Sequence, residues 1–294
     1  MTEGEILARD AFLLLYELRL FWLIVILYLL SFFSYLAHIF TPESSSGQWA
    51  KGLLSAGVLF HTVLIIFRTI EGQSPPFQTL YESLSWFAWS SIVTYLFISR
   101  RWREVYLPGI WVSGIALAAC LYALISRGPE ITPLAPALQS QWFVWHVVLA
   151  FMSYAVFVVS CANEITYLII YPCLKKGIGT SYGLLLENIE KFHETAYRLV
   201  LFGFPLLTFG IISGAAWADE AWGRFWSWDP KETWSLITWT VFALYLHAMV
   251  MPAWRGKPAS IFNILGFICM IMTFVGVNWL AKLLGIESLH LYAI

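Results

Sequence analysis

Long apolar runs recur along this chain, and they restrict its possible folds more than any other feature. A helix needs roughly 20 mainly apolar residues to cross the hydrocarbon core of a bilayer. Eight segments have this character: Leu20–Phe40, Leu53–Ile70, Leu80–Ile98, Val105–Ile125, Trp142–Tyr171, Leu199–Ala218, Trp234–Met251 and Ile261–Leu284. With 60% hydrophobic and 12% charged residues among 294, the chain has too little polar surface for a soluble globule of this size. The sequence therefore predicts an all-α fold, a polytopic membrane helix bundle of about eight transmembrane helices forming one domain over residues 1–294.

The distribution of basic residues predicts the orientation of these helices. The loops after the first, third, fifth and seventh segments carry ten of the seventeen Lys and Arg residues, and short basic loops stay on the cytoplasmic side. Both termini and the loop after the sixth segment are then expected on the outer side of a bacterial plasma membrane or a thylakoid membrane. Within the cytoplasmic connection Lys175–Arg198, an amphipathic stretch is expected to be structural. A net charge of −1 gives no electrostatic basis for a nucleic-acid partner.

Tryptophan is concentrated in residues 214–239, GAAWADEAWGRFWSWDPKETWSLITW, between the sixth and seventh segments. Six of the sixteen tryptophans lie there: Trp217, Trp222, Trp226, Trp228, Trp234 and Trp239. An ordinary interfacial belt needs only one or two such rings at each helix end. The surplus predicts an outer loop that binds a large, flat, apolar ligand.

Local signals inside this loop predict its conformation. Asp229, Pro230 and Glu232 have the spacing of an N-cap, a first-turn proline and a capping-box acid, so a helix is expected to begin at Pro230. Trp222 and Trp226 would share a face if the loop were helical. Its basic side chains either meet anionic groups of a ligand or are simply solvated.

Four of the six histidines fall into two groups. His61 and His247 lie inside predicted helices at comparable depths in the inner half of the membrane, by roughly 1.5 Å of rise per residue. His146 and His290 lie on the outer side. Neutral imidazole is a versatile haem ligand, and each pair offers one imidazole for each face of a porphyrin. A single intramembrane histidine can equally hydrogen-bond a neighbouring helix, and His38 and His193 are expected to be structural.

Other chemistries fit the sequence poorly. The four cysteines form no C-x-x-C pair, and no Cys/His/Asp/Glu cluster has the spacing of a metal site. Neither a G-x-S-x-G elbow nor an H-E-x-x-H motif is present.

The segment WGRFWSWDPKETWSLITW resembles the tryptophan-rich "WWD" signature of haem-handling proteins of cytochrome c assembly. With TVFALYLH after it, the match is specifically to the CcsA (ResC) family, the membrane subunit of the System II cytochrome c synthase. The similarity extends to GFPLLTFGIISGAAWA, LHTVLIIFR, LYESL, WFVWHVVLAFMSYA and SLHLYA, and so covers most of the chain. One departure is the C-terminal His290-Leu291-Tyr292, where the family often has H-S-Y.

This resemblance implies a haem lyase subunit that presents haem b at the outer face for thioether attachment to a C-x-x-C-H apocytochrome c, with haem delivered across the membrane. It maps the outer axial ligands to His146 and His290 and an intramembrane ligand to His247, with His61 as its partner. Trp217, Trp222, Trp226, Trp228 and Asp229 form the expected haem platform. The implied partners are a CcsB/ResB-type membrane subunit, apocytochrome c, a thioredoxin-like thiol reductant and membrane lipid.

Alternative functions remain compatible with parts of this pattern. A b-type cytochrome would also use intramembrane histidine pairs, but it does not need an outer tryptophan loop. A regulatory relative without synthase activity would keep the helices. A transporter would be expected to show related halves or interrupted helices, which the sequence lacks.

Overall fold

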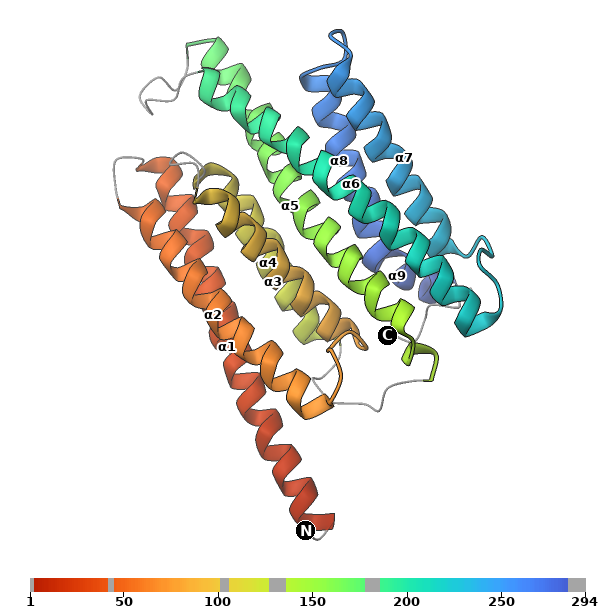
Figure 1. Ribbon diagram of the computed structural model, residues 1–294. Helices are drawn as coiled ribbons and strands as arrows, with labels where there is room; N and C mark the ends of the chain where they lie inside the picture. The colour runs from red at the N-terminus through yellow and green to blue at the C-terminus, as the bar shows by residue number, and fades with distance from the viewer. Residues whose placement is uncertain (1–2, 42–44, 101–105, 127–135, 178–185, 285–294) are drawn as a thin grey trace. The chain divides into compact units, whose positions relative to one another are not determined.

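The computed structural model describes residues 3–41, 45–100, 106–126, 136–177 and 186–284, and all regular structure within these ranges is helical (Figure 1). The elements are α1 (Glu3–Phe40), α2 (Ser46–Gly72), α3 (Leu80–Ser99), α4 (Tyr106–Ser126), η1 (Pro136–Leu138), α5 (Gln141–Lys175), α6 (Leu186–Trp222), α7 (Pro230–Val250), α8 (Lys257–Ile271), η3 (Met272–Gly276) and α9 (Val277–Leu284). Seven helices in the described part are long and apolar enough to cross a membrane. The predicted polytopic helix bundle is thereby confirmed.

The eighth predicted span, Leu80–Ile98, forms the 20-residue helix α3, but α3 is not among the seven helices apolar enough to be membrane spans. Its sequence contains Glu82 and several serines between its apolar residues. Helix α6 also differs from expectation because it has 37 residues, almost twice the predicted Leu199–Ala218. The described part of the amphipathic connection, from Leu186, is therefore the beginning of α6 rather than a separate element.

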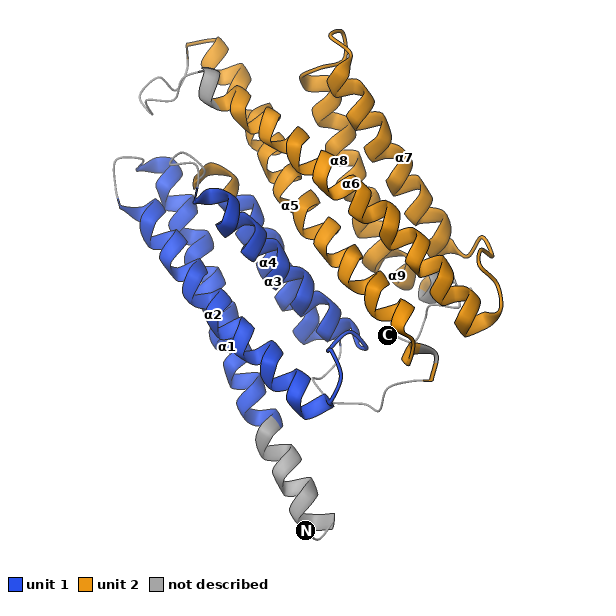
Figure 2. Ribbon diagram, viewed as in Figure 1, with its two compact units in different colours: residues 1–100, 109–134, 294 blue, residues 101–108, 135–293 orange. Residues whose placement is uncertain are grey.

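The chain divides into two compact units, coloured separately in Figure 2: unit 1 comprises residues 1–100, 109–134 and 294, and unit 2 comprises residues 101–108 and 135–293. In unit 1, α1 packs along α2, with α3 beside α2. Polar side chains cross between these helices, since Ser31 Oγ donates to the Ala50 carbonyl at 2.8 Å and Lys51 Nζ donates to the Ser99 carbonyl at 3.2 Å. Such bonds satisfy polar groups that lipid cannot hydrate.

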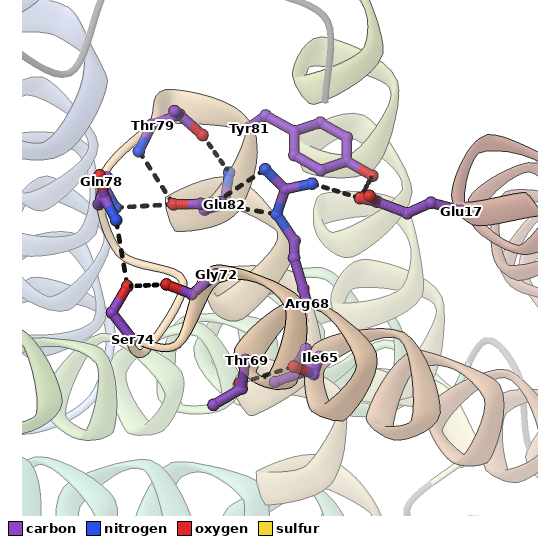
Figure 3. A network of polar contacts seen from close by, with 10 residues as sticks. All are labelled: Glu17, Ile65, Arg68, Thr69, Gly72, Ser74, Gln78, Thr79, Tyr81 and Glu82. Atoms are coloured by element: carbon purple, nitrogen blue, oxygen red, sulfur yellow. Dashed lines mark hydrogen bonds and ion pairs between the residues drawn. The ribbon is translucent and has the colours of Figure 1, made fainter. Parts of the chain in front are cut away.

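A buried ionic network links α1, α2 and α3 within unit 1 (Figure 3). The Arg68 guanidinium on α2 contacts Glu17 of α1 at 2.5 Å and Glu82 of α3 at 2.9 Å, and it lies 5.0 Å from the centre of the Tyr81 ring. The second oxygen of Glu82 accepts the Gln78 backbone N–H at 2.8 Å. One carboxylate thus joins the start of α3 to the arginine that links three helices.

In unit 2, α5 packs extensively on α6, and α8 packs on both α5 and α7. At the centre, the Phe157 and Phe242 rings stack with centroids 3.9 Å apart and planes at 20°. A Cβ atom at Gly203 would lie 2.8 Å from Phe157, and one at Gly266 would lie 3.0 Å from Phe242. Glycine at these two positions therefore allows the helices to approach the stacked rings closely. This packing fixes the helices whose ends carry the tryptophans.

Candidate functional site

His146 lies near the first turns of α5, and its orientation is set by α6. Its Nδ1 lies 2.7 Å from the Gly210 carbonyl oxygen. A carbonyl only accepts hydrogen bonds, so Nδ1 carries the proton and the neutral ring has its lone pair on Nε2. Backbone carbonyls orient metal-binding histidines in the same way. Nε2 is therefore the nitrogen of the neutral ring that is able to coordinate a metal ion.

Aromatic rings and a glycine hold the His146 ring from its sides. Trp217 of α6 is only 4% exposed and stacks on His146, with centroids 6.0 Å apart and planes at 22°. Phe143 and Trp222 lie against Trp217, at 5.1 and 5.0 Å between centroids. A Cβ atom at Gly214 would lie 2.6 Å from His146 Nδ1, so this position has room only for glycine. The imidazole is thus confined to one orientation.

The tryptophan segment consists of a helix end and a short loop. Helix α6 ends at Trp222, and the next residue, Gly223, has φ of +69°. Trp217 and Trp222 are therefore helical residues, whereas Trp226 lies in the loop. The helical loop that would place Trp222 and Trp226 on one face is not formed. Trp226 meets Trp228 edge to face, with centroids 5.8 Å apart and planes at 89°.

Trp228 has φ of +59° and a 67% exposed side chain. A non-glycine residue in the left-handed region costs about 1–2 kcal/mol, so the surrounding bonds must hold it there. A large apolar ring on a strained, exposed backbone position is unfavourable for stability alone, and strain of this kind clusters at functional sites. The ring is available to a ligand or a partner.

The capping residues provide the bonds that hold the loop. The Asp229 carboxylate accepts the Lys231 N–H at 2.9 Å, and the predicted capping box with Glu232 is confirmed. Glu232 Oε2 also accepts the backbone N–H groups of Ser227 at 2.8 Å and Asp229 at 3.2 Å. The two bonded amides flank Trp228 on both sides, so Glu232 fixes the conformation of that residue as well as the start of α7.

The proposed intramembrane histidines have different environments. His61, in unit 1, is 0% exposed, and both its nitrogens have partners: Nδ1 with Tyr28 Oη at 3.0 Å and Nε2 with Ser85 Oγ at 2.7 Å. His247, in unit 2, lies in the last turn of α7 with an exposed side chain. His290, the expected second outer ligand, lies outside the described residues.

A buried cluster around Glu164 in unit 2 was not predicted from the sequence. Glu164 of α5, 0% exposed, contacts the His193 Nδ1 atom at 2.8 Å and accepts hydrogen bonds from Tyr245 and Ser260. His193 was expected to be structural without an obvious partner, and Glu164 is that partner. The available signal was a carboxylate inside the long apolar segment Trp142–Tyr171, because ionisable residues inside membrane spans are rare and often functional.

Comparisons with known proteins identify the family of this chain. A family model described as "Cytochrome C assembly protein" matches residues 77–284. The chain is 35% identical over 312 residues to the cytochrome c biogenesis protein CcsA of Cyanophora paradoxa, covering 90% of this chain and 96% of that protein. It is 36% identical to the proteins of the same name from Guillardia theta, covering 77% and 80% of the two chains, and from Synechococcus sp. (strain RCC307), covering 85% and 86%.

A solved structure, that of cytochrome c heme lyase CcmF, matches with a TM-score of 0.65 at 16% identity. The match covers 90% of this chain and 46% of that protein. It shows a shared fold, and this chain spans less than half of that protein.

Proposed function

This chain belongs to the cytochrome C assembly protein family, and on that premise we propose that it handles haem for the maturation of c-type cytochromes. Haem b is bound as a substrate at the Trp-rich end of unit 2, on the outer face of the membrane. It is presented there for covalent attachment to the C-x-x-C-H motif of an apocytochrome c.

The single observation that carries this proposal is the state of His146. Its Nδ1–H is held by the Gly210 carbonyl, and its ring stacks on the buried Trp217. This arrangement fixes the tautomer and the plane of the ring before a ligand binds, and preorganisation of this kind favours ligand binding. The exposed Trp228 ring offers a flat apolar contact for a porphyrin, and His290 is the proposed second axial ligand.

The chemistry needs positioning more than acid–base catalysis. In each thioether-forming step, a cysteine S–H adds across a haem vinyl group: sulfur bonds to one vinyl carbon, the hydrogen goes to the other, and no leaving group is released. Imidazole ligands fix the iron, and aromatic side chains fix the ring plane, so that both vinyl groups meet the two thiols in one orientation. A haem lyase activity of this kind would be shared with a CcsB/ResB-type membrane subunit, while a thioredoxin-like reductant keeps the thiols reduced.

Haem delivery to this face is proposed to involve haem binding within the membrane, and His247 and His61 are each a candidate ligand for it. The exposed position of His247 supports this role. For His61, iron ligation through Nε2 requires loss of the 2.7 Å contact with Ser85. A His61→Ala variant separates the alternatives: it should lower haem content if His61 is a ligand, and should give a less stable protein with unchanged haem content if His61 only packs between helices. Ser85→Ala keeps the imidazole and is the control, because it should maintain haem content in either case.

The outer site is tested by His146→Ala, with His38→Ala as the matched control. His38 lies on α1, contacts Ser46 Oγ at 3.2 Å and is not a residue of the proposed site. Holocytochrome c formation in cells should be abolished by His146→Ala, partly restored by added imidazole, and unaffected by His38→Ala. Normal holocytochrome yield in His146→Ala would refute the assignment of the outer ligand.

A further inference from the structure

A single buried carboxylate joins all four long helices of unit 2. Glu164 comes from α5, His193 from α6, Tyr245 from α7 and Ser260 from α8. Tyr245 Oη donates to Glu164 Oε1 at 2.8 Å, Ser260 Oγ donates to Oε2 at 2.7 Å, and His193 Nδ1 lies 2.8 Å from Oε2. The carboxylate is therefore the common acceptor of donors from three other helices.

The geometry also fixes which nitrogen of His193 donates. The Gly256 backbone N–H donates to His193 Nε2 at 3.2 Å, so Nε2 is an acceptor and Nδ1 carries the proton that points at Glu164. The Tyr167 ring stacks on the imidazole, with centroids 4.6 Å apart and planes at 19°. His193 is thus held in one tautomer and one plane, and the Glu164 carboxylate has a fixed place in unit 2.

The hydrogen bond from Tyr245 to Glu164 determines which side of α7 faces inward in the last turns of this helix. Tyr245 is 0% exposed, whereas the side chain of His247, two residues later, is exposed. Residues two apart on a helix point about 200° apart, so the contact that turns Tyr245 inward turns His247 outward. Further back along α7, inward contacts are made by Phe242 on Phe157 and by Thr238 on Thr273. Among the described side-chain hydrogen bonds of α7, that of Tyr245 lies nearest to His247.

We propose that Glu164 is a positioning residue for His247 and acts through Tyr245. The inference rests on the proposed function, in which His247 binds haem iron inside the membrane. With the Tyr245–Glu164 bond present, the last turns of α7 keep one rotational setting and His247 presents its imidazole in one direction. Without the bond, the end of α7 is less constrained and the imidazole meets the iron in a smaller fraction of molecules.

The test compares Tyr245→Phe, Glu164→Ala and His247→Ala in the full chain purified with its membrane partner subunit. Tyr122→Phe on α4 is the matched control, because it removes a phenol hydroxyl from a side chain that is 38% exposed in unit 1. Haem content and the fraction of six-coordinate low-spin iron are measured by optical spectroscopy. We expect Tyr245→Phe to reduce occupancy of the intramembrane haem by about tenfold, the order that one hydrogen bond contributes.

Two further readouts separate positioning from general damage. Added imidazole should restore the haem content of both Tyr245→Phe and His247→Ala, which an unfolded protein would not allow. The Glu164→Ala/Tyr245→Phe double variant should lose no more haem than the worse single variant, because both changes break one interaction.

If His247→Ala loses haem while Tyr245→Phe keeps the wild-type content and spectrum, the inference is overturned and the proposed haem site stands. Wild-type haem content in His247→Ala overturns the intramembrane site and this inference together.

Discussion

Removal of the Glu232 carboxylate should release the Trp228 loop. In Glu232→Ala, the backbone N–H groups of Ser227 and Asp229 lose their acceptor, at present 2.8 and 3.2 Å away. At about 1 kcal/mol for each bond, the loop conformation loses about 2 kcal/mol. Trp228 must still adopt a left-handed backbone that costs about 1–2 kcal/mol, and this cost favours relaxation of the loop. A loss of about 2 kcal/mol lowers the ratio of the present loop conformation to relaxed conformations by roughly 30-fold.

Hydrogen–deuterium exchange of the Lys231 amide provides the assay, since this N–H donates to Asp229 and not to Glu232. Its protection should fall in Glu232→Ala although its own acceptor is intact, and haem retention at the outer site should fall with it. Glu232→Gln is the matched control because its amide oxygen still accepts both N–H groups. Unchanged Lys231 protection in Glu232→Ala would show that the loop is held by other contacts and would refute the bracing role.

Three other changes have outcomes that the structure predicts. Gly214→Ala should displace the neighbouring imidazole, because its Cβ would lie 2.6 Å from that ring, and should reduce outer haem binding; Gly52→Ala, whose added Cβ would have no heavy atom within 4 Å, is the control that retains haem. Trp228→Ala should lose haem while the protein inserts normally, whereas Asp229→Asn keeps an acceptor for the N-cap and should remain active; the reverse pattern in haem-content measurements would show a direct role for the Asp229 charge. Arg68→Ala leaves two buried carboxylates without their cation and should destabilise unit 1 by about 3–5 kcal/mol, measured by denaturant unfolding in micelles; an unchanged unfolding midpoint would contradict this.

Local signals in the sequence were sufficient to predict the helices and the start of α7. Asp229, Pro230 and Glu232 act within four residues of one another, so their spacing alone identifies the N-cap that the structure contains. The length of α6 could not be predicted from hydropathy, because its first turns are amphipathic and their polar side chains resemble those of a surface connection. Helix α6 places His193 beside Glu164 at a separation of 29 residues.

Contacts between residues far apart in the sequence determine the orientations of the candidate histidines, and the sequence alone did not predict these contacts. His61 looked like a ligand candidate because imidazole is rare in membrane helices, but its hydrogen bonds to Tyr28 and Ser85 depend on the packing of three helices. The contact of His146 with the Gly210 carbonyl likewise spans 64 residues. Spacing along the chain shows which residue types are present, and only the packed helices show which nitrogen of His146 donates to the backbone.

Ligation of haem iron by His146 Nε2, beside the Trp217 ring, can be measured from the spin state of the bound iron. The measurement compares His146→Ala in a His247→Ala background, which removes the proposed contribution of the intramembrane site, with the single His247→Ala protein. Iron in the single variant is expected to be six-coordinate and low-spin. The added His146→Ala change should make the iron high-spin or remove it, and imidazole should restore the low-spin spectrum. An unchanged low-spin spectrum in the double variant would show that His146 is not a ligand.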